Sequence, residues 1–245
     1  MSGHSKWSTI KHKKAATDAK RGKLFTKVIK ELTIAAKVGG GDPDGNARLR
    51  TAVALAKSVN MPADNIKRAI MKGTGELPGV SYEEVLYEGY GPGGVAILIE
   101  TLTDNRMRTT PEIRHAFAKY GGNMGEPNSV AWMFDRKGEL IVPDSATTED
   151  RLMEVALEAG AEDLQHEDDL FVIQTGFEGF QRVQQALEEA GIAIREAKLI
   201  MQPQNRIELS GKKAEQCVKL LEVLDDNDDA QNVFDNLELA DDVDA

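Results

Sequence analysis

Apolar residues recur every three to four positions in the first third of the chain, the spacing of helices that bury one face. One run ends at Gly39-Gly40-Gly41-Asp42-Pro43, a second covers about 46–59, and Met61-Pro62 separates it from a third that ends at Gly73. The inward positions are Leu24, Phe25, Val28, Ile29, Leu32, Ala35 and Ala36, then Leu49, Ala52, Val53, Ala56 and Val59, then Ile66, Ala69 and Ile70. Three helices with short connections predict a small antiparallel bundle.

Beyond a Gly- and Pro-rich linker at 73–80, apolar residues alternate with period two, as they do in strands. A first series predicts strands at 85–90 and 95–102, a helix at 111–120 and a strand at 130–135. A second predicts strand 139–142, helix 148–159, strands 162–166 and 170–175, helix 177–190 and strand 193–201. A third predicts strand 205–209, helix 211–224 and strand 231–236.

The second series has the βαββαβ order of a ferredoxin-like fold, whereas the first and third each lack a half and together complete one α+β unit. We therefore predict a multi-domain α and α+β protein: an N-terminal three-helix bundle followed by two ferredoxin-like α/β domains, one inserted in the other. The predicted domains are a basic arm plus helical nucleic-acid-binding domain at 1–80, a discontinuous α+β domain at 81–135 and 204–240, and the inserted domain at 136–203.

Charge is distributed unevenly along this organisation. Residues 1–72 hold 16 of the 30 Lys and Arg but 5 of the 41 Asp and Glu, and the remainder holds 14 against 36. A basic end on an acidic body is typical of a protein that binds a polyanion. The alternative is that two surfaces of opposite sign pack against each other.

The basic end predicts a nucleic-acid-binding surface. Its candidate residues are Lys6, Trp7, Lys11, Lys13 and Lys14 on an arm without apolar periodicity, Lys20, Arg21, Lys23, Lys27 and Lys30 on the first helix, and Arg48, Arg50, Lys67 and Arg68 on the next two. Lysines neutralise phosphates, and Trp7 could stack on a base or could instead anchor the arm in a core. The lysines of the first helix, with Lys37, fall opposite its apolar face, where we expect solvent.

Arg106 and Arg108 form a second candidate site. Pro111 favours the first turn of a helix, so both arginines are expected just before a helix N-terminus, where cations are disfavoured. They either bind a phosphate together with the free N–H groups of that helix or pair with acids of the chain.

Other sequence patterns match known motifs but lack a residue or an element that the function of the motif requires. Gly89-Tyr90-Gly91-Pro92-Gly93-Gly94 matches a dinucleotide-binding pattern, but a strand follows it where a helix is required, so we predict a hairpin turn. Asp225-x-Asn227-x-Asp229 begins like a calcium loop, yet Ala230 replaces the glycine that such loops need, and we predict an acidic loop. The four histidines are scattered, and Cys217 is the one cysteine. We expect no enzymatic activity, metal, cofactor or small-molecule substrate.

The chain gives no sign of export or of membrane insertion. The N-terminus is polar and lysine-rich, unlike a secretory signal, and the longest strongly apolar run, 95–99, is too short to cross a bilayer. We expect a cytoplasmic protein without a membrane partner.

Several segments resemble the YebC/PmpR family. They are Gly3-His4-Ser5-Lys6-Trp7, Lys13-Lys14-Ala15, residues 18–23, Phe25-Thr26-Lys27, residues 39–43, residues 87–94, Asp104-Asn105-Arg106, Arg114-His115-Ala116-Phe117 and residues 156–163. Asn128 stands where the family commonly has Gly, and both residues tolerate a left-handed turn.

The resemblance implies a helical first domain, two α/β domains and a role in gene expression without catalysis. Members have been assigned as DNA-binding transcriptional regulators. Related bacterial members and mitochondrial translational activators of cytochrome oxidase resemble ribosome-associated translation factors, which help at difficult sequences such as consecutive prolines. A regulator binding DNA, a factor binding ribosomal RNA and a protein–protein scaffold therefore remain open, and neither the target nor the oligomeric state follows from the sequence.

Overall fold

The computed structural model describes residues 18–240, with side chains from residue 22 onward. The chain divides into two compact units: residues 132–206 form one, and the described residues on either side, 18–131 and 207–240, form the other. The larger unit is therefore built from two separate stretches of the chain, and the smaller one is inserted between them.

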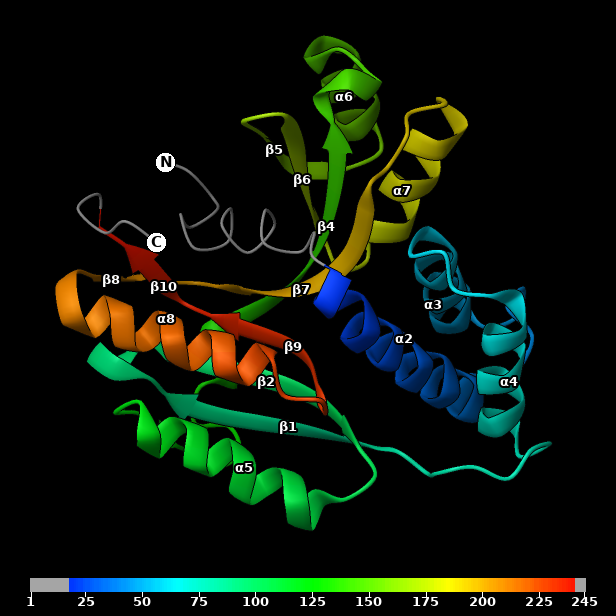
Figure 1. The fold of residues 1–245 in the computed structure, drawn as a ribbon. Coiled ribbons are helices and arrows are strands. Elements are labelled where there is room, and N and C mark those ends of the chain that lie inside the picture. Colours follow the sequence, from blue (N-terminus) through cyan, green and yellow to red (C-terminus); the bar gives the residue numbers. More distant parts are fainter. Residues whose placement is uncertain (1–17, 241–245) are drawn as a thin grey trace. The chain divides into compact units, whose positions relative to one another are not determined.

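The first stretch begins with three helices, α2 (Asp18–Gly39), α3 (Ala47–Ser58) and α4 (Ala63–Thr74) (Figure 1). Their apolar faces form one core, in which Leu32 and Leu49 are fully buried. Helices α2 and α4 approach so closely that a Cβ atom at Gly73 would overlap the backbone oxygen of Thr33. The bundle was predicted, but Leu24 was expected in its core and is exposed instead.

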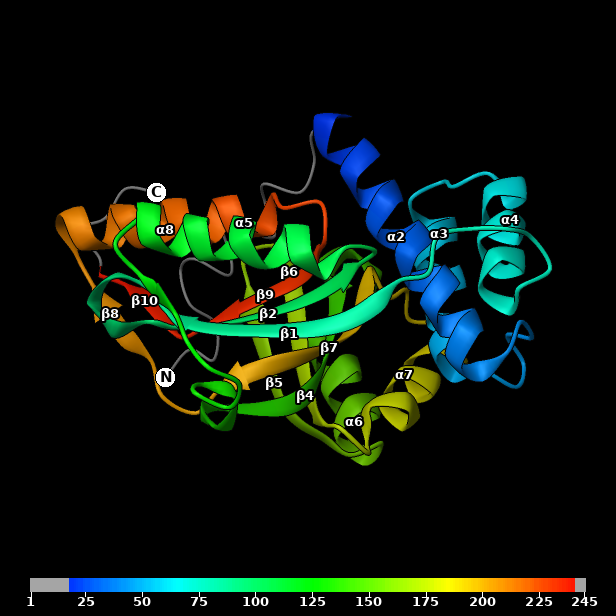
Figure 2. The same cartoon turned by 90° about the horizontal axis from the view of Figure 1, so that it is seen from below.

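The larger unit continues with a four-stranded antiparallel sheet in the order β3-β1-β2-β9. Its strands are β1 (Glu83–Tyr90), β2 (Ala96–Thr103), β3 (Asn123–Met124) and β9 (Ala230–Asp235). Helices α5 (Arg106–Lys119) and α8 (Gly211–Asp225) cover one face of this sheet (Figure 2) and bury Ile97, Phe117 and Leu220. Strands β8 (Ile207–Leu209) and β10 (Leu237–Leu239) form a separate parallel pair. A central strand, β2, thus pairs with a strand from the far end of the chain.

The glycine-rich segment after β1 is a hairpin turn, as predicted. Residues Pro92–Gly94 form a 3₁₀ turn, Gly93 and Gly94 have φ of 73° and 85°, and β2 follows directly. A left-handed backbone of this kind favours glycine. No helix follows that could bind a pyrophosphate.

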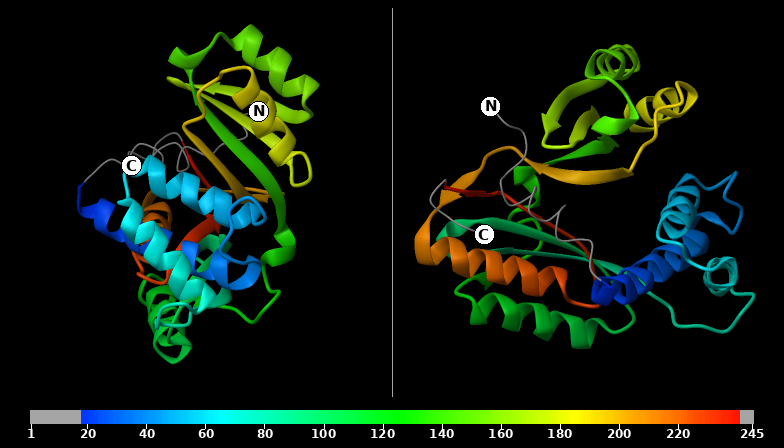
Figure 3. Two further views of the ribbon diagram at one scale, coloured as in Figure 1. Left: turned by 90° about the vertical axis from the view of Figure 1, so that its right-hand side faces the viewer. Right: turned by 45° about the horizontal axis from the view of Figure 1, so that its top comes forward.

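The inserted unit has a four-stranded antiparallel sheet in the order β5-β6-β4-β7. Its elements are β4 (Phe134–Pro143), α6 (Glu149–Glu158), β5 (Ala161–Glu167), β6 (Leu170–Gly176), α7 (Phe180–Glu189) and β7 (Glu196–Pro203). Helices α6 and α7 lie side by side (Figure 3) and bury Leu152 and Leu187 against Leu140 and Ile173 of the sheet. This βαββαβ unit confirms the predicted fold class. The limits of three separately folding domains, 1–80, 81–135 with 204–240, and 136–203, stay a prediction.

The strand predicted at 130–135 is wrong. Strand β3 lies earlier, β4 begins only at Phe134, and the segment between them is a loop around the buried carboxylate of Glu88. That carboxylate accepts hydrogen bonds from the backbone N–H groups of Asn128, Val130 and Ala131 at 2.7–2.8 Å. Asn128 is left-handed, with φ of 66°. A side chain from another strand takes up the donors that a sheet would have used.

The helix predicted at 111–120 starts five residues earlier. The Asn105 side chain caps α5 by accepting from the backbone N–H of Arg108 at 3.1 Å, and the Thr103 hydroxyl accepts from the N–H of Asn105 at 2.9 Å. Pro111 therefore lies in the second helical turn, where it removes one backbone hydrogen bond. Capping outweighs the preference of proline for the first turn.

Candidate nucleic-acid interface

Three lysines of α2 contact an acidic loop, residues 225–229, that joins α8 to β9. Lys23 Nζ donates to the backbone oxygen and the carboxylate of Asp226 at 3.0 and 3.2 Å. Lys27 Nζ donates to the backbone oxygen of Asp225 at 3.1 Å. One lysine per helical turn thus meets an oxygen of this loop, about 200 residues away in the chain.

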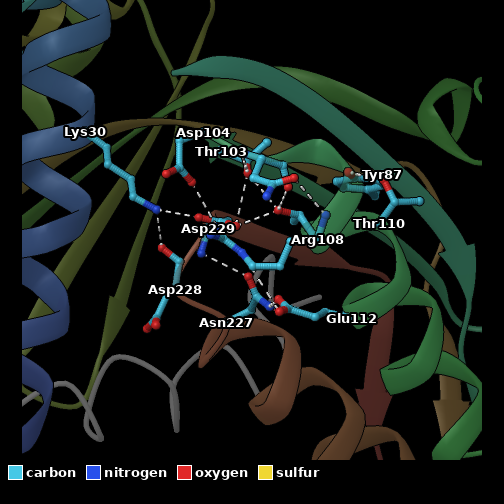
Figure 4. Close-up of polar contacts among 12 residues, drawn as sticks. Lys30, Tyr87, Thr103, Asp104, Arg108, Thr110, Glu112, Asn227, Asp228 and Asp229 are labelled. Carbon is cyan, nitrogen blue, oxygen red and sulfur yellow. Dashed lines mark hydrogen bonds and ion pairs between the residues drawn. The ribbon is translucent and has the colours of Figure 1, made fainter. Parts of the chain in front are cut away.

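The third lysine, Lys30, belongs to a buried cluster around Asp229 (Figure 4). Its Nζ lies 2.7 Å from the Asp229 carboxylate and 2.7 Å from the backbone oxygen of Asp228. The second carboxylate oxygen of Asp229 accepts from Arg108 and Thr109 at 2.6 Å each and from Thr103 at 3.2 Å. The side chains of Lys30 and Asp229 are 8% and 3% exposed. Helix α2, helix α5 and strand β2 therefore meet at one carboxylate.

The Asp229 carboxylate is held in its charged form. Burial by itself would raise its pKa, but the hydrogen bonds from Lys30, Thr109 and Arg108 outweigh burial and lower the pKa to about 2. The same contact with Asp229 raises the pKa of Arg108. A buried charge with several good hydrogen bonds is tolerated, whereas the loss of one partner leaves the other uncompensated.

The expectation that the lysine face of α2 is solvated is therefore wrong for Lys30 and incomplete for its neighbours. Lys30 is buried, Lys27 is half-buried, and Lys37 donates to the Ser81 hydroxyl at 2.8 Å. A signal was present in the sequence, because Ile34 continues the row of Lys23, Lys27 and Lys30 and is buried. An apolar residue in a row of lysines indicates that part of the protein covers that face.

The two arginines predicted as a pair have different surroundings. Both lie in the first turn of α5, not before it as expected. Arg108 pairs with Asp104 at 3.0 Å and with Asp229 at 2.6 Å, which agrees with the alternative of pairing with acids. The side chain of Arg106 is exposed and forms no hydrogen bond or ion pair with any other described residue, and the side chain of its neighbour Met107 is exposed as well.

Two basic residues of α3 serve the fold locally. Arg48 forms a two-pronged ion pair with Glu31 at 2.6 and 2.9 Å and contacts Glu84 at 2.7 Å, and its pKa is raised chiefly by the bond to Glu31. Arg50 donates to the backbone oxygens of Pro43 and Asp44 at 3.1 and 3.2 Å. Neither guanidinium is wholly available to an external phosphate.

A second set of basic residues has exposed side chains without partners among the described residues. Lys67, Arg68 and Lys72 of α4, which we call the α4 cations, are exposed, as is Lys57 of α3. Within residues 22–240, none of these four side chains has a hydrogen-bond or ion-pair partner. Among the described residues of the three helices, the α4 cations and Lys57 are thus exposed positive charges without an ion-pair partner.

Other predicted residues cannot be placed. Lys6, Trp7, Lys11, Lys13 and Lys14 lie outside the described residues, and Lys20 and Arg21 contribute only backbone to the described part of α2. The role of all these residues in nucleic-acid binding stays a prediction.

The described residues contain no group of three or more His, Cys, Asp or Glu side chains that could hold a metal ion. In the acidic loop, which resembles the start of a calcium loop, the carboxylate of Asp229 accepts hydrogen bonds from Lys30, Arg108 and Thr109. No helix between residues 18 and 240 is both long and apolar enough to cross a bilayer.

Two family profiles match nearly the whole chain. Residues 5–76 match the TACO1/YebC protein N-terminal domain, and residues 82–237 match the TACO1/YebC second and third domain. A relative from Desulfosudis oleivorans is 60% identical over 243 residues, covering 99% of each chain, and one from Geobacter sulfurreducens is 58% identical over 240 residues, covering 98% of this chain and 97% of its own. Both are named "Probable transcriptional regulatory protein".

A solved structure agrees with this assignment. The crystal structure of a conserved hypothetical protein from Aquifex aeolicus superposes with a TM-score of 0.90 at 46% identity, covering 98% of this chain and 99% of that one. Sequence profiles, close relatives and fold all agree, so the chain belongs to the TACO1/YebC family.

Proposed function

We propose that this protein is a nucleic-acid-binding regulator of gene expression that contacts the phosphate backbone through its helical domain. The observation that carries the proposal is the contrast among the basic residues of that domain. Lys23, Lys27, Lys30 and Arg48 are compensated by acids or carbonyls, whereas the α4 cations are exposed without partners among the described residues. Uncompensated cations on one helix provide the electrostatic term of nucleic-acid binding.

The first candidate is a DNA-binding transcriptional regulator, in line with the name that its relatives carry. Such a protein must prefer its site over random duplex, typically by at least about 10³-fold at physiological salt. It acts in the cytoplasm and needs neither a cofactor nor a catalytic group.

The second candidate is a ribosome-associated translation factor acting at difficult sequences such as consecutive prolines. It is favoured by the composition of the open surface, where three of the four open cations, Lys57, Lys67 and Lys72, are lysines. Lysine is a point charge that neutralises phosphates, while base reading favours planar or two-pronged groups. This surface is better suited to the backbone than to base edges.

The role of the α4 cations is tested by replacing Lys67, Arg68 and Lys72 with Gln in the full chain. The slope of log affinity against log salt should become shallower by roughly 2 to 3, because each lost phosphate contact removes about 0.7 to 0.9. The matched control replaces the exposed Lys212, Lys213 and Lys219 of α8, which removes the same charge elsewhere. Equal losses in both variants would mean that net charge, and not this surface, governs binding.

A competition at physiological salt separates the two candidates. A labelled promoter fragment competes with random duplex and with purified ribosomal subunits. Promoter binding that resists both competitors supports the DNA-binding regulator, and loss of promoter preference with tight subunit binding supports the translation factor. Binding to neither nucleic acid nor subunits would leave the protein–protein scaffold.

A further inference from the structure

The acidic loop meets the lysine row of α2 as a short polyanion would. Lys23 and Lys27 donate to the backbone oxygens of Asp226 and Asp225 at 3.0 and 3.1 Å, and the carboxylates of these two residues lie 3.2 and 4.0 Å from the same amines. Lys30 donates to the carboxylate of Asp229 at 2.7 Å. The spacing of these lysines, four and three residues, places them in one row along the helix. Phosphates of a nucleic acid that followed this row would need the positions that the loop oxygens now hold.

The contacts differ in strength along the row. At the inner end, Lys30 and Asp229 are almost fully buried, and Asp229 is also bound by Arg108 and Thr109. At the outer end, the side chains of Lys23 and Asp226 are 46% and 66% exposed, and those of Lys27 and Asp225 are 19% and 42% exposed. Exposed ion pairs contribute about 0 to 1 kcal/mol, and salt screens them further. The outer contacts can therefore be exchanged while the inner pair keeps α2 docked.

We propose that the acidic loop is a built-in competitor for nucleic acid, which occupies Lys23 and Lys27 until a phosphate backbone displaces Asp225 and Asp226. The proposal rests on the proposed function, because it concerns regulation of the same basic domain. The loop is tethered, so it meets the lysines at a high effective concentration without having to bind tightly.

The test measures the affinity of the full chain for a fluorescein-labelled random 24-base-pair duplex over a range of salt. Asp225→Asn with Asp226→Asn removes both carboxylate charges and leaves the backbone contacts to Lys23 and Lys27 in place, and this variant should bind about fivefold more tightly than wild type. The salt slope should steepen by roughly 0.7 to 1.8, because one or two further lysines then meet phosphates. A second arm with single-stranded RNA of random sequence shows whether the competition is with phosphate backbone in general.

Two controls separate this mechanism from a change of net charge. Glu154→Gln with Glu158→Gln, at exposed positions of α6, removes the same charge and should leave affinity within twofold of wild type. Lys23→Gln with Lys27→Gln should have little effect while the loop is acidic, but should cancel the gain in the Asp225→Asn, Asp226→Asn protein. Thermal unfolding confirms that each variant is folded.

The outcomes distinguish the two levels of the proposal. If the lysine substitutions weaken binding equally with and without the loop charges, the lysines are already open and the competitor is disproved while nucleic-acid binding stands. If the loop variant and the α6 variant gain equally, general charge explains the effect and the competitor is again disproved. If no variant binds either probe, the proposed function fails, and this inference fails with it.

Discussion

Helices α2 and α4 both carry rows of basic side chains, yet the two rows have opposite relations to the rest of the protein. The row of α2 faces the acidic loop, and its innermost lysine is buried against Asp229. The side chains of Lys67, Arg68 and Lys72 on α4 are exposed and form no hydrogen bond or ion pair with another described residue. This comparison shows that a row of lysines indicates a binding surface only where no acidic side chain from a distant part of the chain neutralises its charge.

The largest change in stability should follow removal of the Asp229 carboxylate, which pairs with Lys30 of α2. Asp229→Ala is expected to lower the free energy of unfolding by about 3–5 kcal/mol, because Lys30 would stay buried without its partner. Urea unfolding followed by circular dichroism measures the loss. Asp228→Asn is the matched control, since Lys30 contacts the backbone oxygen of Asp228 and the side chain is exposed. If the control loses as much, the loop backbone and not the buried charge pair stabilises the docking.

Lowering the pH should weaken the contact between Asp229 and Lys30, with a smaller loss of stability than Asp229→Ala. The folded-state pKa of Asp229 is about 2, below its ordinary value of 3.8, so the stability it contributes is present above pH 4 and is lost as the pH falls towards 2. The shift corresponds to about 2 kcal/mol. Unfolding measured between pH 6 and pH 2 should show this component in wild type, and it should be missing in Asp229→Asn. Parallel curves for the two proteins would show that other carboxylates dominate acid unfolding.

The smallest effect compares the two arginines at the start of α5. Arg108→Ala should lower the free energy of unfolding by about 1 kcal/mol, because its side chain is 44% exposed and Asp229 retains Lys30, Thr103 and Thr109. Arg106→Ala should leave stability unchanged, since that side chain has no partner in the described residues. A loss of function without loss of stability in Arg106→Ala would support an anion contact at Arg106. Equal destabilisation by both substitutions would contradict the assignment of Arg108 alone to the Asp229 cluster.

Local sequence patterns predicted most elements because helix and strand periodicities depend on near neighbours. The bundle, the hairpin turn at Gly93 and the βαββαβ order of the insertion all follow from spacing and from glycine or proline positions. The strand expected at 130–135 failed because Glu88, some 40 residues away, binds the backbone of that segment. The start of α5 was misplaced because the prediction rested on Pro111 alone, whereas the Asn105 side chain caps the helix by accepting from the backbone N–H of Arg108.

The candidate surface was predicted only in outline. Net charge identified the basic end of the chain but left open whether that end binds a polyanion or packs against the acidic body. The pattern at 225–229 predicted an acidic loop but did not indicate that this loop contacts α2. Ile34 was the one signal that the lysine face is covered.

The sequence by itself predicted most of the elements, the βαββαβ order of the insertion and the basic character of the first third, since each depends on composition or on spacing within one segment. Tertiary structure alone decided which cations are compensated. The acidic loop follows α2 in the chain by about 200 residues, a stretch that includes the insertion of residues 132–206, and β9 brings the loop back by pairing with β2. Electrostatic compensation depends on distance in space, and that distance is fixed only when the sheet closes.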